Sequence, residues 1–481
     1  MSGSVDLQIG VGPLEHFYRE AGRRSGSDRS LRLDRISAGP HALDTVVDLA
    51  AGGREGRAVV VGDRTEILRD GVAVKRWVAQ AFRDAGFDVE LVVIGGEDEL
   101  HTTPEHVTEV RTRLRHDDTV VVVGSGTIVD ITKHAVLALE ESGPSSDVVL
   151  TAVQTANSVC AFTSGLTVLT SDGVKRTVPS RLVDRLLLDT TLLSQAPRDY
   201  TLGGIGDAAV SASSIADYRL AHLLGQGRWE PLAWDVVEPG RELFLGGAPA
   251  WADPGVAGAE RLGLDLAACG LAMTFAGESA PLSGLEHVTS HMLDMAAGYR
   301  GRLVGNHGSQ CGLATALVLI AFEVLLDEVD LQSVDLDARA VDRDAEELSV
   351  RTAFEHLDAD GATWRECWSD YSTKLDAWRA GASTIRDFQA SWPAHRDDLR
   401  RYLVPADEYM RALAVAGHPL SWSDVPPGIG EDEARWAFEN ARLMRKRVSV
   451  ADVLYFAGVW STSFVDRIFD RFHEICDEIA A

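Results

Sequence analysis

The segment Thr119–Lys133, with the sequence TVVVVGSGTIVDITK, constrains the fold of this chain more than any other stretch. Four consecutive valines, Val120 to Val123, are followed at once by Gly124-Ser125-Gly126 and then by residues with helical spacing. A valine run bounded by glycine is typical of a buried parallel strand. A glycine turn that opens a helix presents backbone N–H groups that can hold a pyrophosphate. The segment therefore predicts either a nucleotide-binding strand–turn–helix unit or a tight turn without a ligand.

Strand and helix patterns of this kind alternate over the first 190 residues. The expected strands are residues 35–40, 58–61, 89–94, 120–123, 148–153, 166–170 and 181–188, and the expected helices are 43–51, 72–85 and 106–115. Such alternation predicts a parallel sheet with helices on both faces. Ligands of these sheets bind at the carboxyl ends of the strands. Gly62-Asp63, Gly95-Gly96 and the turn at Gly124 are three such ends.

The pattern changes after Asp189, where apolar residues take a helical spacing that continues to the C-terminus. We expect a boundary near Pro197-Arg198, with residues 1–197 as a dinucleotide-binding α/β domain and residues 198–481 as an α-helical domain. The segment 226–262 is rich in glycine, proline and tryptophan, and we expect it to be a loop-like insertion.

Composition excludes several classes of partner. The chain has 481 residues and a formal net charge of −27, which argues against a nucleic acid or an anionic membrane as a partner. The start of the chain lacks the features of a signal peptide, and we expect no apolar run of the ~18 residues that span a bilayer. Few, widely spaced cysteines suit a reducing compartment, so we expect a cytoplasmic protein. They are Cys160, Cys269, Cys311, Cys367 and Cys476.

Three stretches of the second half carry candidate metal ligands. They are GGIGD ending at Asp207, SGLEHVTSH containing His287 and His291, and GNHG containing His307. One carboxylate and two imidazoles suit Zn²⁺, Fe²⁺ or Ni²⁺ with a coordination position left open. His287 and His291 are four residues apart, so both face the same side of a helix. Taken singly, an aspartate before an apolar helix is more often an N-cap than a ligand, and a histidine is usually a hydrogen-bonded core or surface residue.

In order and spacing, these motifs resemble the iron-containing (metal-dependent) alcohol dehydrogenase superfamily, and within it the sn-glycerol-1-phosphate dehydrogenases of the bacterial arabinose-operon type. The segments that carry the resemblance are VGSGTIVDITK (123–133), SDGVKRTVPSRLVDRLLLDTTLLSQAP (171–197), GGIGD (203–207), SGLEHVTSH (283–291), NHG (306–308), WRECWSDYSTKL (364–375) and ARLMRKRVSVADVL (441–454). The resemblance implies a Rossmann-like N-terminal domain and an all-helical C-terminal domain with the active site in the cleft between them. It also implies a small-molecule substrate and assembly into a homo-oligomer, which we expect to be a dimer.

The resemblance assigns roles to individual residues. It implies that Asp207, His287 and His307 ligate the metal, and that His291 lies beside the nicotinamide and the substrate as a further catalytic residue. The implied cofactor-binding residues are Asp63, Gly124, Ser125, Gly126, Asp130, Thr155 and Ser158. A carboxylate at Asp63 would accept hydrogen bonds from the ribose of NAD, while the neighbouring Arg64 would suit NADP.

The sequence departs from the family pattern in two places. The Pro-Thr-x-x-Ser-x-Asp segment of relatives reads Gln154 to Cys160 here, so its proline and its aspartate are both replaced. That aspartate belongs to the substrate side of the site in polyol enzymes, which leaves the substrate open. The segment after His307-Gly308 continues Ser309-Gln310-Cys311, where relatives often carry an acid.

These observations predict an NAD(P)-dependent, metal-dependent oxidoreductase that interconverts a small hydroxy compound and its ketone. Glycerol 1-phosphate and dihydroxyacetone phosphate are the first substrate pair to test, with Lys175, Arg300 and Arg302 as candidate cations for the phosphate. Two alternatives stay open: a dehydroquinate-synthase-like cyclase that uses NAD transiently, and a degenerate, non-catalytic binding protein. The metal (zinc, nickel or iron) and the choice between NAD and NADP are not fixed by the sequence.

Overall fold

The computed structural model describes residues 5–8, 32–96, 100–143, 146–171, 174–246, 251, 253, 255–337 and 342–481. The expected turn residues Asp172 and Gly173 lie outside this part of the chain. The chain divides into two compact units. The first unit is residues 1–204, 235–237 and 249–279, and the second is residues 205–234, 238–248 and 280–481.

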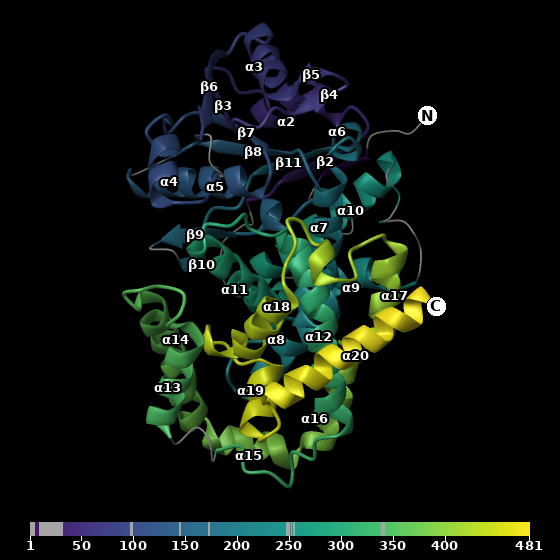
Figure 1. Cartoon of the computed structure of the whole chain (residues 1–481). Helices are drawn as coiled ribbons and strands as arrows, with labels where there is room; N and C mark the ends of the chain where they lie inside the picture. The colour runs from purple at the N-terminus through teal and green to yellow at the C-terminus, as the bar shows by residue number, and fades with distance from the viewer. Residues whose placement is uncertain are drawn as a thin grey trace. The chain divides into compact units, whose positions relative to one another are not determined.

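The first unit is built on a seven-stranded sheet with the order β1-β2-β11-β8-β7-β3-β6 (Figure 1). All neighbouring strands are parallel except β1, which pairs antiparallel with β2. The strands are β1 (Val5–Gln8), β2 (Arg35–Gly39), β3 (Arg57–Asp63), β6 (Asp88–Ile94), β7 (Thr119–Gly124), β8 (Val149–Gln154) and β11 (Arg185–Asp189). Two short hairpins accompany the sheet, β4 (Leu68–Arg69) with β5 (Val72–Ala73) and β9 (Leu166–Ser171) with β10 (Val174–Pro179).

The valine run of β7 shows why this sheet is buried on both faces. Val120 and Val122 belong to one apolar core and Val121 and Val123 to the other, and all four are fully buried. Each such side chain contributes roughly 1.5–3 kcal/mol by leaving water. The helices over the first core are α4 (Pro104–Arg111), α5 (Gly126–Glu141) and α10 (Val256–Ala276), and those over the second are α2 (Val46–Ala51) and α3 (Val74–Asp84). The short helix α6 (Thr190–Ser194) contributes a leucine to each core.

The second unit is helical throughout its described residues. Its helices are the end of α7 (Arg198–Ala209), α8 (Ser214–Leu223), α9 (Pro231–Leu245), α11 (Leu285–Tyr299), α12 (His307–Asp327), α13 (Arg343–Phe354), α14 (Ala362–Ala380), α15 (Ala382–Ala390), α16 (Trp392–Arg400), α17 (Ala406–Val415), α18 (Glu431–Asn440), α19 (Val450–Phe456) and α20 (Thr462–Ala480). The unit is organised around α12, which packs against α11, α17, α19 and α20.

Two expectations from the sequence need correction. The segment 226–262 is not loop-like, because its described residues include the helix α9 and the start of α10. Pro231 occupies the first turn of α9, where the N–H that proline lacks would be unpaired in any case. The expected single boundary at 197/198 lies close to residue 204, where the chain first passes from the first unit to the second. The chain later returns to the first unit, because α10 packs with the sheet.

The expected absence of a long apolar run was also wrong. Within the described residues, α12 is long and apolar enough to cross a bilayer, and its most apolar part is 94% buried inside the protein. A helix that is apolar all round is found in the core of a large protein as well as in a membrane, and the burial of α12 identifies it as a core helix.

Candidate metal centre

A close approach between α7 and α12 brings Asp207 to the first turn of α12. A Cβ added at Gly206 would lie 2.1 Å from the carbonyl oxygen of Gly308, so the backbones of the two helices touch at this point. The helix α12 begins at His307, because the side chain of Asn306 caps it by accepting the N–H of Ser309 at 3.1 Å. Glycine next to the aspartate therefore places the carboxylate beside the first imidazole of α12.

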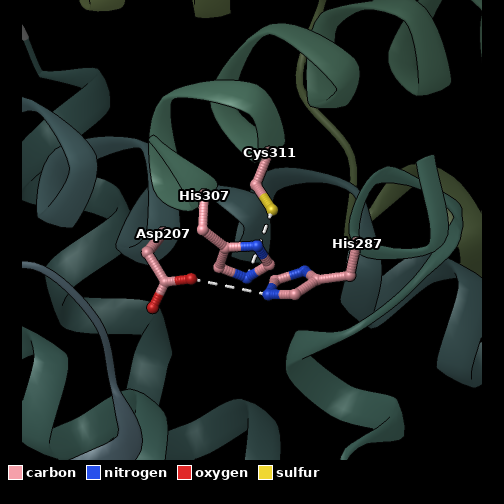
Figure 2. A group of neighbouring side chains, drawn as sticks. All are labelled: Asp207, His287, His307 and Cys311. Atoms are coloured by element: carbon pink, nitrogen blue, oxygen red, sulfur yellow. Dashed lines mark hydrogen bonds and ion pairs between the residues drawn. The ribbon is translucent and has the colours of Figure 1, made fainter. Parts of the chain in front are cut away.

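Four potential ligand atoms converge within the second unit, from Asp207, His287, His307 and Cys311 (Figure 2). All of them lie within 4.8 Å of one another. The His287 Nε2 atom lies 3.4 Å from Asp207 Oδ1, and the Cys311 Sγ atom lies 3.8 Å from His307 Nε2. Asp207, His287 and Cys311 are buried, and His307 is half-buried. The structure thus brings together the three predicted ligands and adds a thiol.

Neighbouring groups fix which nitrogen of each histidine faces this cluster. The Nδ1 atom of His287 lies 3.1 Å from Glu286 Oε1, and a carboxylate can only accept this hydrogen bond. The Ser290 hydroxyl donates to Gln310 Oε1 at 2.5 Å, so its oxygen accepts from His307 Nδ1 at 2.8 Å. Both neutral rings therefore carry their proton on Nδ1 and direct the Nε2 lone pair into the cluster, as metal-binding histidines do.

The groups around His287 and His307 raise the pKa of both imidazoles. Burial by itself lowers the pKa of His287, but Cys311, Asp207 and Glu286 outweigh it and raise that pKa well above its usual value. Burial likewise opposes a charged His307, whose pKa is nevertheless raised, chiefly by Cys311. The cluster therefore favours a positive charge at its centre, which a divalent cation would supply. One carboxylate, two Nε2 lone pairs and a thiol are a donor set that fits zinc or a similar ion.

His291 lies beside this cluster without belonging to it. Its ring stacks on that of His307 with 5.6 Å between centroids, and its centroid is 6.4 Å from that of His287. An N–H of the Arg445 guanidinium donates to His291 Nδ1 at 2.9 Å. Because arginine can only donate, His291 accepts at Nδ1 and holds its proton at Nε2 when it is neutral.

The glycine turn in the first unit has the predicted form. It joins the carboxyl end of β7 to the start of α5, and within this described segment the Ser125 side chain makes no cap hydrogen bond. A Cβ at Gly124 would lie 2.2 Å from the Ile128 side chain, and one at Gly126 would lie 2.6 Å from that of Val159. Both glycines are thus required for close packing. The first N–H groups of α5 are not satisfied within the helix, so an anion can bind them.

Asp130 supports this turn from inside the protein. One of its carboxylate oxygens accepts from the buried Lys133 ammonium at 2.9 Å, and the other accepts the backbone N–H of Val168 at 3.1 Å. Lys133 also donates to the carbonyl oxygens of Ala161 and Leu166. Asp130 thus links α5 to β9. Its direct contact with a cofactor stays a prediction.

The other predicted cofactor residues lie at the same edge of the sheet. Thr155 follows β8, is buried, and donates its N–H to the Gly124 carbonyl at 3.3 Å, while Ser158 is half-buried. Asp63 ends β3, and its Oδ1 atom is 2.7 Å from the Lys75 ammonium. Cys160, where the resemblance implies an aspartate, is a buried cysteine that forms no disulfide.

The predicted phosphate-binding cations are not equivalent. Arg300 and Arg302 both pair with the carboxylate of Glu433, and each side chain is 45% exposed. Arg302 also lines a cavity of about 290 Å³ together with Gln310. The side chain of Lys175 lies outside the described residues. Arg445, which the sequence did not single out, is the arginine that contacts His291 directly.

Sequence reasoning missed the groups that orient the histidines. Glu286 and Ser290 lie inside the SGLEHVTSH motif, and their positions next to the histidines were a usable signal. Cys311 is four residues after His307, a spacing that places both on one side of a helix. Arg445 offered no such signal, because it is 154 residues from His291 in the sequence.

Comparisons with known proteins extend these observations. Residues 37–197 match the family described as iron-containing alcohol dehydrogenase, a match that ends before Asp207. The glycerol-1-phosphate dehydrogenase [NAD(P)+] of Halalkalibacterium halodurans is 31% identical over 244 residues, which cover 50% of this chain and 59% of the relative. The protein of the same name from Methanothrix thermoacetophila is 28% identical over 292 residues, which cover 59% of this chain and 76% of the relative.

Solved structures share the fold. The iron-containing alcohol dehydrogenase of Thermotoga maritima superposes with a TM-score of 0.53 at 13% identity, covering 92% of this chain and 98% of that one. The glycerol dehydrogenase of Schizosaccharomyces pombe gives a TM-score of 0.53 at 15% identity, covering 91% of this chain and 90% of that one. The chain is therefore similar to iron-containing alcohol dehydrogenases over residues 37–197, spans 59% of the length of the Halalkalibacterium relative, and shares its fold with these solved structures.

Proposed function

We propose that this protein is an NAD(P)-linked, metal-dependent oxidoreductase that interconverts a small hydroxy compound and its ketone. The observation that carries the proposal is the convergence of Asp207, His287 and His307, with both imidazole Nε2 lone pairs directed at one point. Glycerol 1-phosphate and dihydroxyacetone phosphate are the proposed substrate pair, which the names of two similar proteins support.

A divalent ion held by these three side chains would supply a Lewis acid for the substrate oxygen. The surrounding residues prepare that position. Glu286 keeps His287 in the tautomer that leaves Nε2 unprotonated, and Ser290 does the same for His307. His291 holds a proton at Nε2, where it can donate a hydrogen bond to an oxygen of the substrate, because Arg445 occupies its Nδ1.

The proposed nucleotide-binding site lies in the first unit. The turn at Gly124–Gly126 and the free N–H groups at the start of α5 suit a pyrophosphate. Asp63 ends the strand next to β7 and is proposed to contact the ribose. Its pairing with Lys75 offsets the repulsion that a lone carboxylate would exert on a 2′-phosphate, so NAD and NADP both remain candidates.

Arg445 is the proposed contact for an anionic group of the substrate. Its guanidinium contacts His291, whose ring stacks on that of His307. In a chain with a net charge of −27, a phosphorylated substrate needs a local positive charge of this kind. The variant Arg445→Gln should raise KM for dihydroxyacetone phosphate by about 10-fold or more, since a lost charged hydrogen bond costs about 1.5–3 kcal/mol. Arg300→Gln serves as the matched control, and an equal effect of both variants would remove Arg445 from this role.

The proposed activity is tested by NADH and NADPH oxidation with dihydroxyacetone phosphate, after loading the protein with Zn²⁺, Ni²⁺ or Fe²⁺. We expect net oxidation of one nucleotide with stoichiometric product, which separates a dehydrogenase from a cyclase that returns its cofactor. Asp207→Asn should lower kcat by about 100-fold or more, because the loss of an anionic ligand weakens binding of the metal that supplies the Lewis acid. Asp199→Asn, on the exposed first turn of the same helix, is the control. Turnover by Asp207→Asn at the wild-type rate would contradict the proposal.

The cytoplasmic location and the homo-oligomeric state belong to the same proposal. All five cysteines lie in the described part of the chain and none of them forms a disulfide there, which agrees with a reducing compartment. Sedimentation velocity measures the oligomer, and we expect a dimer.

A further inference from the structure

We propose that Cys311 is the fourth protein ligand of the metal, so that the resting ion has one oxygen, two nitrogen and one sulfur donors. The inference rests on the proposed metal centre of Asp207, His287 and His307, and it goes beyond it. The three-ligand set leaves the fourth coordination position to water or substrate, whereas a thiolate would fill that position from the protein.

The helix α12 places Cys311 directly over the cluster. Its position four residues after His307 puts both side chains on the same side of the helix, and Figure 2 shows the sulfur pointing at the His307 ring. The thiol is fully buried, and its Sγ atom lies within 4.8 Å of each ligand atom of the other three residues. Gly312, the next residue, packs against the Gly206 backbone, so this turn of α12 is held against α7.

Two distances within the cluster are close to those of a tetrahedral coordination shell. Typical bonds to zinc are about 2.05 Å for nitrogen, about 2.1 Å for oxygen and about 2.3 Å for sulfur. At a tetrahedral angle these bonds set nitrogen and oxygen about 3.4 Å apart, and nitrogen and sulfur about 3.6 Å apart. The structure has 3.4 Å between His287 Nε2 and Asp207 Oδ1, and 3.8 Å between His307 Nε2 and Cys311 Sγ. The first distance exceeds the usual 2.7–3.2 Å of an N–H···O hydrogen bond.

A thiol that coordinates a divalent cation loses its proton to the influence of that charge. A thiolate, and not a thiol, is the form that ligates a metal. The alternative is that Cys311 is a small buried residue that packs beside His307 without binding a metal.

A sulfur donor would also select the metal. Thiolate with imidazole in a tetrahedral arrangement favours Zn²⁺ or Co²⁺, whereas open sites built from histidine and carboxylate suit Fe²⁺. We therefore expect the full-length protein to retain zinc in preference to iron when both are supplied.

X-ray absorption at the zinc edge of the zinc-loaded, full-length protein tests the proposal. We expect one sulfur neighbour at about 2.3 Å in the wild type. This sulfur contribution should disappear in Cys311→Ala and Cys311→Ser. The matched control is Cys269→Ser, which alters a buried cysteine on α10 in the first unit and should leave the sulfur contribution unchanged.

Zinc affinity and the cobalt spectrum give independent readouts. Loss of a direct ligand should weaken zinc binding by at least about 10-fold, since loss of an outer-shell partner already costs 10- to 100-fold. The Co²⁺-loaded wild type should show thiolate-to-cobalt charge-transfer absorption that Cys311→Ser lacks. Thermal unfolding establishes that each variant is folded, and the spectra of the wild type decide the question if the variants are not.

The possible outcomes separate this inference from the proposed function. A wild-type spectrum with only nitrogen and oxygen neighbours, in a protein that binds one zinc and loses it in Asp207→Asn, overturns the role of Cys311 and leaves the oxidoreductase intact. A wild type that binds no divalent metal overturns both. A single sulfur neighbour that depends on Cys311 supports the proposal.

Discussion

Gly206 lies where the backbones of α7 and α12 touch beside the metal centre. An alanine Cβ at this position would lie 2.1 Å from the carbonyl oxygen of Gly308, and ordinary contact begins at 3.4 Å. The helices α7 and α12 would therefore have to separate by about 1.3 Å, the difference between these two distances. The opposing atom belongs to the backbone, so it cannot turn aside as a side chain can. Overpacking of this kind costs about 1–3 kcal/mol of unfolding free energy.

The same separation should remove Asp207 from the metal. Ligand distances in metal sites are defined to about 0.2 Å, and a displacement of about 1.3 Å is several times larger. We expect Gly206→Ala to lower the free energy of unfolding by about 1–3 kcal/mol and to weaken zinc binding by at least about 10-fold. Chemical denaturation of the metal-free protein measures the first effect, and competitive titration against a zinc chelator measures the second.

The matched control is Gly298→Ala, at an exposed helical position of α11 where a Cβ would have no neighbour within 4 Å. It should stabilise the protein by about 0.5–1 kcal/mol through helix propensity and leave zinc affinity unchanged. Wild-type stability and wild-type zinc affinity in Gly206→Ala would refute the contact between α7 and α12 as the reason that the ligands converge.

Three further predictions follow from buried polar groups. Glu286→Gln should weaken zinc binding by about 10- to 100-fold, as measured by the same chelator competition, because the carboxylate that orients His287 is lost. Lys133→Met should cost about 3–5 kcal/mol in denaturant unfolding, since it leaves the buried carboxylate of Asp130 without its partner; a cost below ~1 kcal/mol would contradict the pairing. Burial lowers the pKa of His418 from 6.5 to about 4. The folded state therefore keeps His418 neutral while the unfolded state takes up a proton, so its contribution is present above pH 6.5 and is lost as the pH falls towards 4, by at most about 3 kcal/mol. His418→Asn should flatten the fall in stability between pH 6.5 and 4.

The parts of the fold that the sequence predicted are those with strong local patterns. The run Val120–Val123 indicated a strand buried on both faces, and the structure distributes these valines between the two cores of the sheet. The segment 226–262 was misjudged because glycine and proline suggest loops, whereas Pro231 begins a helix. The prediction that the chain has no long apolar stretch was also wrong, because α12 is apolar along most of its length and lies buried in the helical unit.

The candidate site was predictable to the extent that its residues belong to compact motifs. Asp207, His287 and His307 were singled out from the sequence, and their ligand atoms lie together in the structure. Cys311 had a helical signal that was read only as a departure from the family. The role of Arg445 depends on a contact across 154 residues, which no local pattern encodes.

The central claim is that Asp207, His287 and His307 hold one divalent ion. A crystal structure of the zinc-loaded protein, with anomalous diffraction recorded on either side of the zinc absorption edge, measures this directly. The account predicts a single anomalous peak about 2.0–2.2 Å from both Nε2 atoms and the Asp207 carboxylate. Crystals that contain stoichiometric zinc with no anomalous peak between these side chains would contradict it.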